Sequence, residues 1–352
     1  MTKHLVCLSF LTKLTLLFNI RLVGWYIPTL LHLVRTCGRG FAARGVSYAG
    51  HGLSDDITDV ERWMSSSPTT RSESERDTNI PWTVDGQIQH KVAYLDLIAT
   101  QMDERRHRQR QEQNGSDHQL SPKSTESSHH RTRYIWLGHS IGCHMIQRLL
   151  VLRPDILKQT DLVIHLMPFN RMDAPRRWQW FCDTLSSRPG PVIRHAQSFM
   201  RLLAMLPVHV LDTLLKGDIQ CDNGRKIAVD LLQQPHFGRN FLELGSEEVR
   251  DVPEVPDVHA YRIIGSQCPL AILFAGQDNW APEFHMTDIL TLQAKGVIPS
   301  SSIHCTYLPH LVHDFPVRPP MVVDVNKFCM DTIESQVLRL RRRRSGNLQS
   351  ML

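Results

Sequence analysis

The feature that most constrains the fold lies in residues 134–152. An apolar, β-prone run there leads into Gly-His-Ser-Ile-Gly and continues into a segment with apolar residues on one broad helical face. This order predicts a strand, a sharp turn and a helix. The flanking Gly138 and Gly142 have no Cβ, so strand and helix can approach closely enough to expose the Ser140 hydroxyl. The segment predicts a nucleophile elbow, with a structural glycine-rich turn as the alternative. The predicted elbow residues around the serine are Gly138, His139 and Gly142.

A carboxylate and two imidazoles follow strands predicted later in the chain. The apolar run at residues 269–275 leads to Asp278, and His310 and His313 follow the next strand pattern. A neutral serine is a weak nucleophile, so it needs an imidazole base, whose tautomer a carboxylate must fix. We predict Ser140 as the nucleophile and Asp278 as the orienting acid. His313 is the predicted base, and His310 is the alternative.

Metal binding is the competing interpretation of the C-terminal histidines. His304, Cys305, His310 and His313 are metal-ligating residue types, but no second ligand group with helical or zinc-knuckle spacing accompanies them. The sequence therefore predicts neither a metal nor another cofactor. The 8 cysteines are scattered singly without a Cys-x-x-Cys pair, which predicts reduced thiols and no disulfide framework.

Strand and helix patterns alternate along much of the chain. Apolar residues recur at helical spacing in residues 27–34 and 85–102, and strand-like runs occupy residues 41–48 and 162–167. Such alternation predicts an α/β fold with a mostly parallel sheet covered by helices on both faces. We assign residues 25–338 to this domain.

Several segments depart from that alternation. Residues 104–131 are of low complexity and predict a disordered insert. The alternation stops between about residues 168 and 260, where the long apolar segment 192–215 predicts a helical cap; core helices are the alternative. A cap rich in Met, Leu and Trp favours an apolar substrate or a lipid surface.

The two termini differ from the domain in composition. Residues 339–352 form a basic tail that we expect to be disordered, and its five arginines account for much of the net charge of +5. That charge is too local to predict a nucleic-acid partner. Residues 1–24 are apolar but interrupted by Lys13, which makes them a poor signal peptide and a poor membrane-spanning helix. A buried strand or an interfacial anchor is the preferred interpretation.

Four blocks of residues resemble the lipid droplet-associated hydrolases, a family of α/β-hydrolases from eukaryotic lipid droplets and the endoplasmic reticulum. The most specific block is Asp-Gly-Gln-Ile-Gln-His-Lys at residues 85–91. The others are Ser-Tyr-Ala-Gly-His-Gly at residues 47–52, the elbow at residues 138–142, and Gly-Gln-Asp-Asn-Trp-Ala-Pro at residues 276–282. The resemblance extends from about Trp25 to the last predicted helix, outside the insert.

This resemblance implies an α/β-hydrolase fold and a triad of Ser140, Asp278 and either His310 or His313. It implies a serine ester hydrolase that acts on a lipid ester, either a cholesteryl ester or an acylglycerol, through an acyl-enzyme. The expected location is the lipid droplet or the periphery of the endoplasmic reticulum membrane. The sequence predicts no oligomeric state.

One part of the family pattern is missing from the sequence. The family begins with a strand that runs into a Gly-Asn-Pro-Gly loop, whose backbone N–H completes the oxyanion hole, whereas residues 21–28 read Arg-Leu-Val-Gly-Trp-Tyr-Ile-Pro. We therefore expect an N-terminal strand and oxyanion loop that are atypical or missing, with the N–H of Ile141 as the remaining donor. Loss of one donor typically costs about 10²–10³-fold in rate. The alternative function is a catalytically weak or inactive droplet-associated scaffold with a role in lipid storage.

Overall fold

All the strand pairs in the described part of the chain are parallel. The structure, a computed structural model, describes residues 14–19, 23–38, 41–46, 83–115, 133–172, 176–187, 189–234 and 237–338. One sheet has the order β2-β1-β3-β4-β5-β6. Its strands are β1 (Leu14–Asn19), β2 (Phe41–Val46), β3 (Arg133–His139), β4 (Thr160–Leu166), β5 (Leu270–Gln277) and β6 (Ile303–Val312). The predicted α/β fold with a parallel sheet is confirmed.

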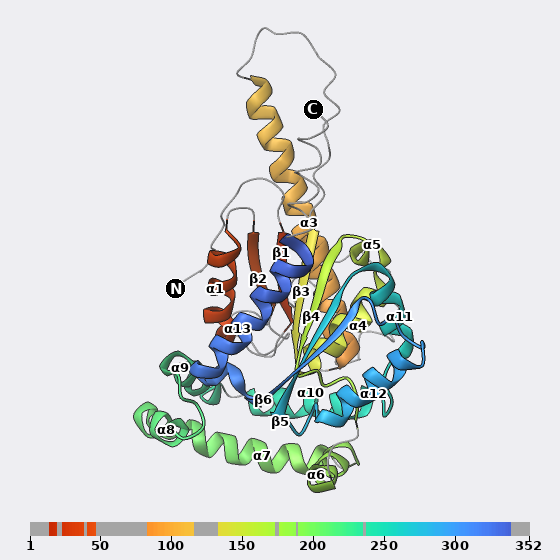
Figure 1. Cartoon of the computed structure of the whole chain (residues 1–352). Coiled ribbons are helices and arrows are strands. Elements are labelled where there is room, and N and C mark those ends of the chain that lie inside the picture. The colour runs from red at the N-terminus through yellow and green to blue at the C-terminus, as the bar shows by residue number, and fades with distance from the viewer. Residues whose placement is uncertain are drawn as a thin grey trace, which may run out of the picture.

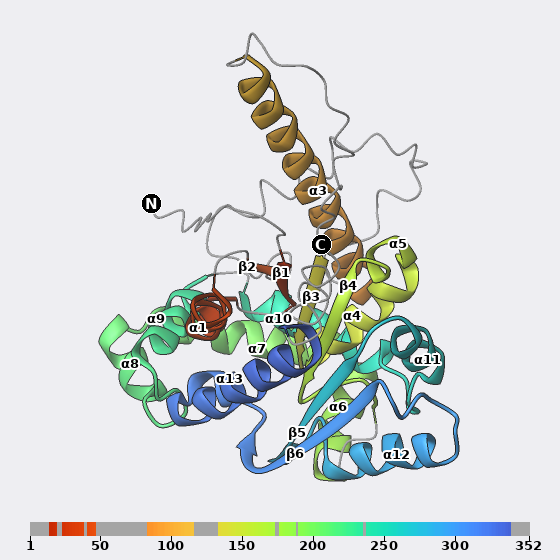
Figure 2. The ribbon, with the colours of Figure 1, turned by 45° about the horizontal axis from the view of Figure 1, so that its top comes forward.

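Helices cover both faces of the sheet (Figures 1 and 2). Alternate residues of β3 point to opposite faces, so Ile135 and Leu137 pack with one set of helices while Tyr134 and Trp136 pack with the other. The first set is α1 (Ile27–Cys37) and α13 (Pro319–Ile333). The second set is α3 (Val84–Gly115), α4 (Ile141–Leu152), α11 (Val258–Gln267) and α12 (Glu283–Ala294), with the short α5 (Pro154–Leu157) following α4.

The N-terminal strand is present, so the expectation that it is atypical or missing is wrong, whereas the strand interpretation of residues 1–24 is confirmed for residues 14–19. β1 lies between β2 and β3, and its last residue, Asn19, is in register with Gly138. Lys13 precedes this strand and does not interrupt it. The sheet thus begins inside the segment that the sequence placed before the domain. Residues 20–22, where the oxyanion loop was expected to be absent, lie outside the described residues, as do residues 1–13.

Helix α3 corrects the predicted start of the disordered insert. The helix continues to Gly115 and therefore includes the first part of the segment 104–131. Arg, Gln and Glu are good helix formers, and Glu104 forms an ion pair with Arg108 one turn later at 3.6 Å. A polar composition does not by itself indicate disorder, since it also suits an exposed helix. Residues 116–132, like the basic tail 339–352, lie outside the described residues.

Five helices lie wholly within the described residues of the segment predicted to form a cap. They are α6 (Arg176–Ser187), α7 (Pro189–Ala204), α8 (Val208–Leu215), α9 (Asp222–Leu232) and α10 (Phe237–Asp251). Helix α10 packs against α6 and α7, and α6 to α8 lie along the bottom of the molecule beyond β5 and β6 (Figure 1). Apolar residues of α7 are well exposed, including Phe199 (60%) and Leu202 (64%), which does not fit the core-helix alternative. The boundaries of the cap, about 168–260, stay a prediction.

Two of the cap helices are apolar enough to raise the question of a membrane span. Within the described ranges, no single helix is long and apolar enough to cross a membrane. Helices α7 and α8 together have the required length and composition, but they are bent by 118° at their junction, which contains Pro207.

Strand β6 extends further than its hydropathy suggests. It reaches Val312, so His310 lies within the strand and not in the loop after it. The pairing shifts near its end, where Gln277 of β5 is in register with Val312. Gly276 permits this approach, because a Cβ at that position would clash with the backbone carbonyl of Pro309.

We expect Gly276→Ala to lower the free energy of unfolding by about 1–3 kcal/mol, since the added methyl group must push β5 and β6 apart. Urea unfolding followed by far-UV circular dichroism measures this change. Gly217→Ala is the matched control, because a Cβ at position 217 would have no neighbouring atom within 4 Å. Equal stability of the two variants would contradict the close approach.

Candidate active site

The turn after β3 has the backbone of a nucleophile elbow. Ser140 has φ 56° and ψ −132°, a conformation that is costly for a residue with a side chain. Three hydrogen bonds hold it: the Ser140 N–H donates to the Leu166 carbonyl at 3.1 Å, and the Ser140 carbonyl accepts from Cys143 N–H at 3.0 Å and from Phe169 N–H at 3.1 Å. The neighbouring strand and helix therefore stabilise the strained residue.

The glycines of the elbow lie where strand meets helix. A Cβ on Gly138 would lie 2.9 Å from both the Cα and the backbone N of Cys143 in α4. Only glycine permits this contact without displacing the helix. Gly142 is buried in the first turn of α4.

The structure brings Ser140, His313 and Asp278 into one hydrogen-bonded chain. The Ser140 Oγ lies 2.9 Å from His313 Nε2, and His313 Nδ1 lies 2.8 Å from Asp278 Oδ2. A carboxylate only accepts, so Nδ1 of a neutral His313 carries the proton and Nε2 is free to accept from the serine hydroxyl. This is the arrangement that activates a serine for attack.

Asp278 is fixed and ionised in spite of its burial. Its side chain has no exposed surface, and Oδ1 accepts hydrogen bonds from the N–H groups of Trp280 at 2.8 Å and Ala281 at 2.9 Å. Burial by itself raises the pKa of this carboxyl, but His313 and the two backbone donors outweigh that effect and hold the pKa below its ordinary value. The aspartate is therefore a rigid, negatively charged partner for the imidazole.

His310 lies apart from this chain of hydrogen bonds. It is on β6, its side chain is 54% exposed, and its Nε2 lies 2.8 Å from Asp324 Oδ2 of α13. Of the two candidate bases, only His313 is placed to accept the proton of Ser140.

Ile141 begins α4, and the first N–H groups of a helix have no partner inside that helix. The predicted oxyanion donor is therefore at the positive end of the α4 dipole, next to the Ser140 hydroxyl. A second donor would come from the connection after β1, whose end is level with Gly138, but residues 20–22 of that connection lie outside the described residues.

Sequence reasoning missed one residue beside the triad. The Tyr26 hydroxyl lies 2.7 Å from His139 Nδ1, and His139 Nε2 lies 3.0 Å from the carbonyl oxygen of His313. Tyr26 ends the 3₁₀-helix Val23–Tyr26 and is 113 residues away from its partner, so no local spacing links the two. The only signal was its position next to Trp25, where the resemblance to the family begins.

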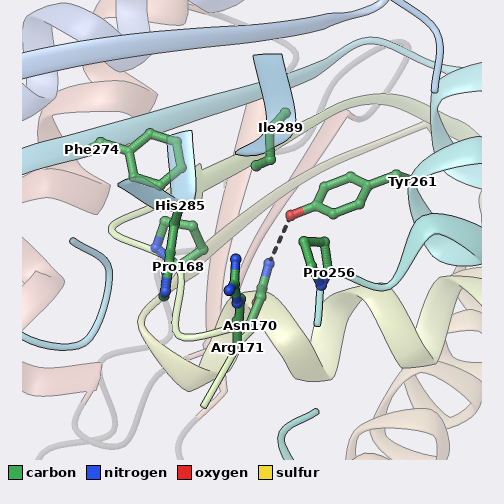
Figure 3. A pocket seen from close by; sticks show the side chains of 8 residues that line it. All are labelled: Pro168, Asn170, Arg171, Pro256, Tyr261, Phe274, His285 and Ile289. Carbon is green, nitrogen blue, oxygen red and sulfur yellow. Dashed lines mark hydrogen bonds between the residues drawn. The ribbon is translucent and has the colours of Figure 1, made fainter. Parts of the chain in front are cut away.

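A small pocket lies near the site but contains no triad residue (Figure 3). Its volume of ≈ 20 Å³ is close to the space one water molecule needs, which is far too small for an acyl chain. Asn170 donates to the Tyr261 hydroxyl across it at 3.5 Å. Its walls are Pro168, Asn170, Arg171, Pro256, Tyr261, Phe274, His285 and Ile289.

Among the residues that the structure describes, no group of three or more His, Cys, Asp or Glu side chains is arranged to hold a metal ion. Of the residues weighed as ligands, His313 instead contacts Ser140 and Asp278, and His310 contacts Asp324.

The parallel sheet, the strained serine after its third strand in the chain, and the order Ser-Asp-His define an α/β-hydrolase. The sequence model of the lipid-droplet associated hydrolases matches residues 19–316, so the chain belongs to this family. No curated protein sequence matches the chain significantly.

The chain is also similar to solved structures. A thermophilic esterase from Thermogutta terrifontis, with malate bound, is 13% identical; 92% of this chain and 90% of that chain are covered, with a TM-score of 0.50. A deformylase from Pseudomonas putida S16 is 12% identical over 90% of this chain and 92% of that chain, with a TM-score of 0.49. At this identity, the esterase shows the shared fold alone.

We expect His313→Gln and His310→Gln to differ in the reactivity of Ser140. Loss of a general base costs about 10²–10⁴-fold, so His313→Gln should slow phosphonylation by a fluorophosphonate probe by that factor, whereas His310→Gln should leave it within about twofold. Time-resolved probe labelling measures both rates. A slow His310→Gln variant beside a fast His313→Gln variant would reverse the assignment.

Proposed function

We propose that this protein is a serine ester hydrolase that acts on lipid esters by acyl transfer. The observation that carries the proposal is the hydrogen-bonded chain from Ser140 through His313 to the buried Asp278, with distances of 2.9 Å and 2.8 Å. Membership of a hydrolase family supports the same reaction class. Cholesteryl esters and acylglycerols are the proposed substrates, because both present an ester next to long apolar chains.

The proposed reaction proceeds in two halves. Ser140 Oγ forms a bond to the ester carbonyl carbon while its proton passes to His313 Nε2. As the tetrahedral intermediate collapses, the bond to the alcohol oxygen breaks and His313 returns that proton to the departing alkoxide. Water then attacks the acyl-enzyme carbonyl as its proton passes to His313, and the bond to Ser140 Oγ breaks while His313 returns that proton to the serine, which releases the fatty acid.

Each neighbouring group has a proposed part in this cycle. The negative charge of Asp278 stabilises the imidazolium that forms on His313 after each proton transfer. The N–H of Ile141 stabilises the oxyanion, and the N-terminus of α4 adds its positive dipole there. The Asp278 carboxylate therefore offsets the positive charge that forms on His313, and the positive end of the α4 dipole offsets the negative charge of the oxyanion.

The proposed site of action is the surface of a lipid droplet or the periphery of the endoplasmic reticulum membrane. The name of the family points to droplets. In addition, α6 to α8 and the turn between α7 and α8 carry six apolar side chains that are each more than half exposed, here called the cap ridge: Trp180, Phe199, Leu202, Met205, Val208 and Leu214. Arg194, Arg201 and Lys216 are exposed on or beside the same helices. Apolar side chains with nearby cations suit a phospholipid monolayer.

A second candidate function is a droplet-bound scaffold with little or no turnover. The cap ridge favours it, because docking through α6 to α8 does not require the triad. The two candidates differ in what the loss of Ser140 changes: the enzyme loses its chemistry, whereas the scaffold keeps its location.

We expect a fluorophosphonate probe to label the wild-type protein at Ser140 and not to label Ser140→Ala. Mass spectrometry of the labelled peptide locates the adduct, and release of fatty acid from cholesteryl oleate and triolein emulsions measures turnover. His310→Gln is the control for a nonspecific loss of labelling, because it retains the nucleophile. Labelling of the alanine variant would refute the assignment, and labelling without fatty-acid release would favour the scaffold.

We expect three charges on the cap ridge to weaken binding to droplets. The variant Phe199→Glu/Leu202→Glu/Met205→Glu should float at least tenfold less with phospholipid-coated triolein droplets, because apolar side chains are worth about 1.5–3 kcal/mol each when buried. The matched control places the same charges at Leu152, Val255 and Val323, which are 55%, 66% and 65% exposed elsewhere. Equal flotation of both variants would show that another surface docks.

A further inference from the structure

A second histidine touches the backbone of the proposed base. His139 precedes Ser140 directly, and its Nε2 lies 3.0 Å from the carbonyl oxygen of His313. The two imidazole rings are close, with centroids 4.8 Å apart. The residue before the nucleophile therefore contacts the loop that carries the base.

The hydrogen-bond partners determine the protonation of His139. A carbonyl oxygen only accepts, so Nε2 must carry a proton in order to bond to His313. The Nδ1 atom of a neutral imidazole then has a lone pair, and the Tyr26 hydroxyl donates to it at 2.7 Å. Tyr26 thus selects the tautomer of His139 that can bind the His313 backbone.

The surroundings keep the His139 imidazole neutral and the Tyr26 hydroxyl protonated. Phe315, which is fully buried, contacts the His139 ring edge-on at 5.3 Å and the Tyr26 ring edge-on at 6.1 Å. Burial and the neighbouring His313 lower the pKa of His139 to about 3, and burial raises the pKa of Tyr26 well above its ordinary value. His139 is therefore neutral at pH 7, so it does not oppose a positive charge on His313, and Tyr26 retains its proton.

We propose that Tyr26 and His139 are positioning residues that hold His313 in line with Ser140. The Tyr26 hydroxyl fixes the tautomer of His139, and the His139 Nε2–H fixes the His313 carbonyl. This role rests on the proposed function, because His313 is the base of that reaction. It assigns a purpose to the segment after β1, which reaches His139 through the Tyr26 side chain.

The tether matters because the base lies in a short connection. His313 follows the last residue of β6 and precedes the 3₁₀-helix Phe315–Val317, so few backbone hydrogen bonds restrain it. A displacement of about 1 Å between reacting groups can cost about 10²-fold in rate. The bond from His139 connects the carbonyl of the base to the strand that carries the nucleophile.

Four variants of the full chain separate this role from simple packing. Tyr26→Phe removes only the hydroxyl, and His139→Leu removes both hydrogen bonds of the imidazole. His139→Gln supplies an amide N–H for the His313 carbonyl and an amide oxygen for Tyr26. Tyr261→Phe is the control, since it deletes another buried tyrosine hydroxyl that contacts Asn170 and not the triad.

Two measurements are made on each variant at pH 7. The first is the rate at which a fluorophosphonate probe phosphonylates Ser140. The second is the NMR signal of the His313 Nδ1 proton, which reports its hydrogen bond to Asp278 whether or not the protein reacts with the probe. We expect labelling to slow about tenfold in Tyr26→Phe and about 10²-fold in His139→Leu, with faster exchange of the Nδ1 proton in both. His139→Gln and Tyr261→Phe should stay within about threefold of the wild type.

The outcomes distinguish this inference from the proposed function. Wild-type protein that is not labelled refutes the proposed function, and the Nδ1 proton of His313 then decides the positioning role by itself. Unchanged labelling and an unchanged Nδ1 proton in Tyr26→Phe and His139→Leu would overturn the inference. An equal loss in Tyr261→Phe, or no recovery in His139→Gln, would also overturn it, because either result would indicate general packing.

Discussion

The alignment of the carboxyl ends of the parallel strands is the constraint on which the rest of the structure depends. Ser140 follows β3, Asp278 follows β5, and His313 follows β6, so three residues from distant parts of the chain meet at one edge of the sheet. In a parallel sheet every strand ends on the same side, and each connection must return over a face of the sheet. The helices that make these returns also bury the strands on both sides.

Contacts from neighbouring elements stabilise the strained Ser140 and the buried Asp278 at this edge of the sheet. The unusual backbone of Ser140 is held by β4 through the Leu166 carbonyl and by the chain after β4 through the Phe169 N–H. Trp280 donates its backbone N–H to Asp278, and its ring packs edge-on against Phe169 at 5.1 Å. The loop that carries Asp278 and the elbow are thus packed on the same phenylalanine, which couples the position of the carboxylate to that of the nucleophile.

The sequence predicted those features of the fold and of the candidate site that depend on a local pattern of residues. The elbow, the order Ser140, Asp278 and His313, and the α/β class follow from apolar runs that end in particular residues. It failed at the charged half of α3, which has a composition that disordered segments share. It left the N-terminal segment open between a strand, an interfacial anchor and a missing strand, because the pairing of β1 with strands on both sides is a long-range contact. The choice between His310 and His313 needed the register of β6 on β5, and Tyr26 needed the tertiary contact with His139. No spacing within a single segment contains that information.

The proline in β6 has a consequence for how separate molecules meet. β6 is the last strand in the sheet order, and an outermost strand is a template on which a strand from another chain can pair. Pro309 has no N–H to offer such a partner, and the pairing irregularity on the β5 side twists the strand at nearly the same point. Intermolecular sheet extension is therefore disfavoured along the strand that leads to His313, the proposed base, by the covalent structure of that strand.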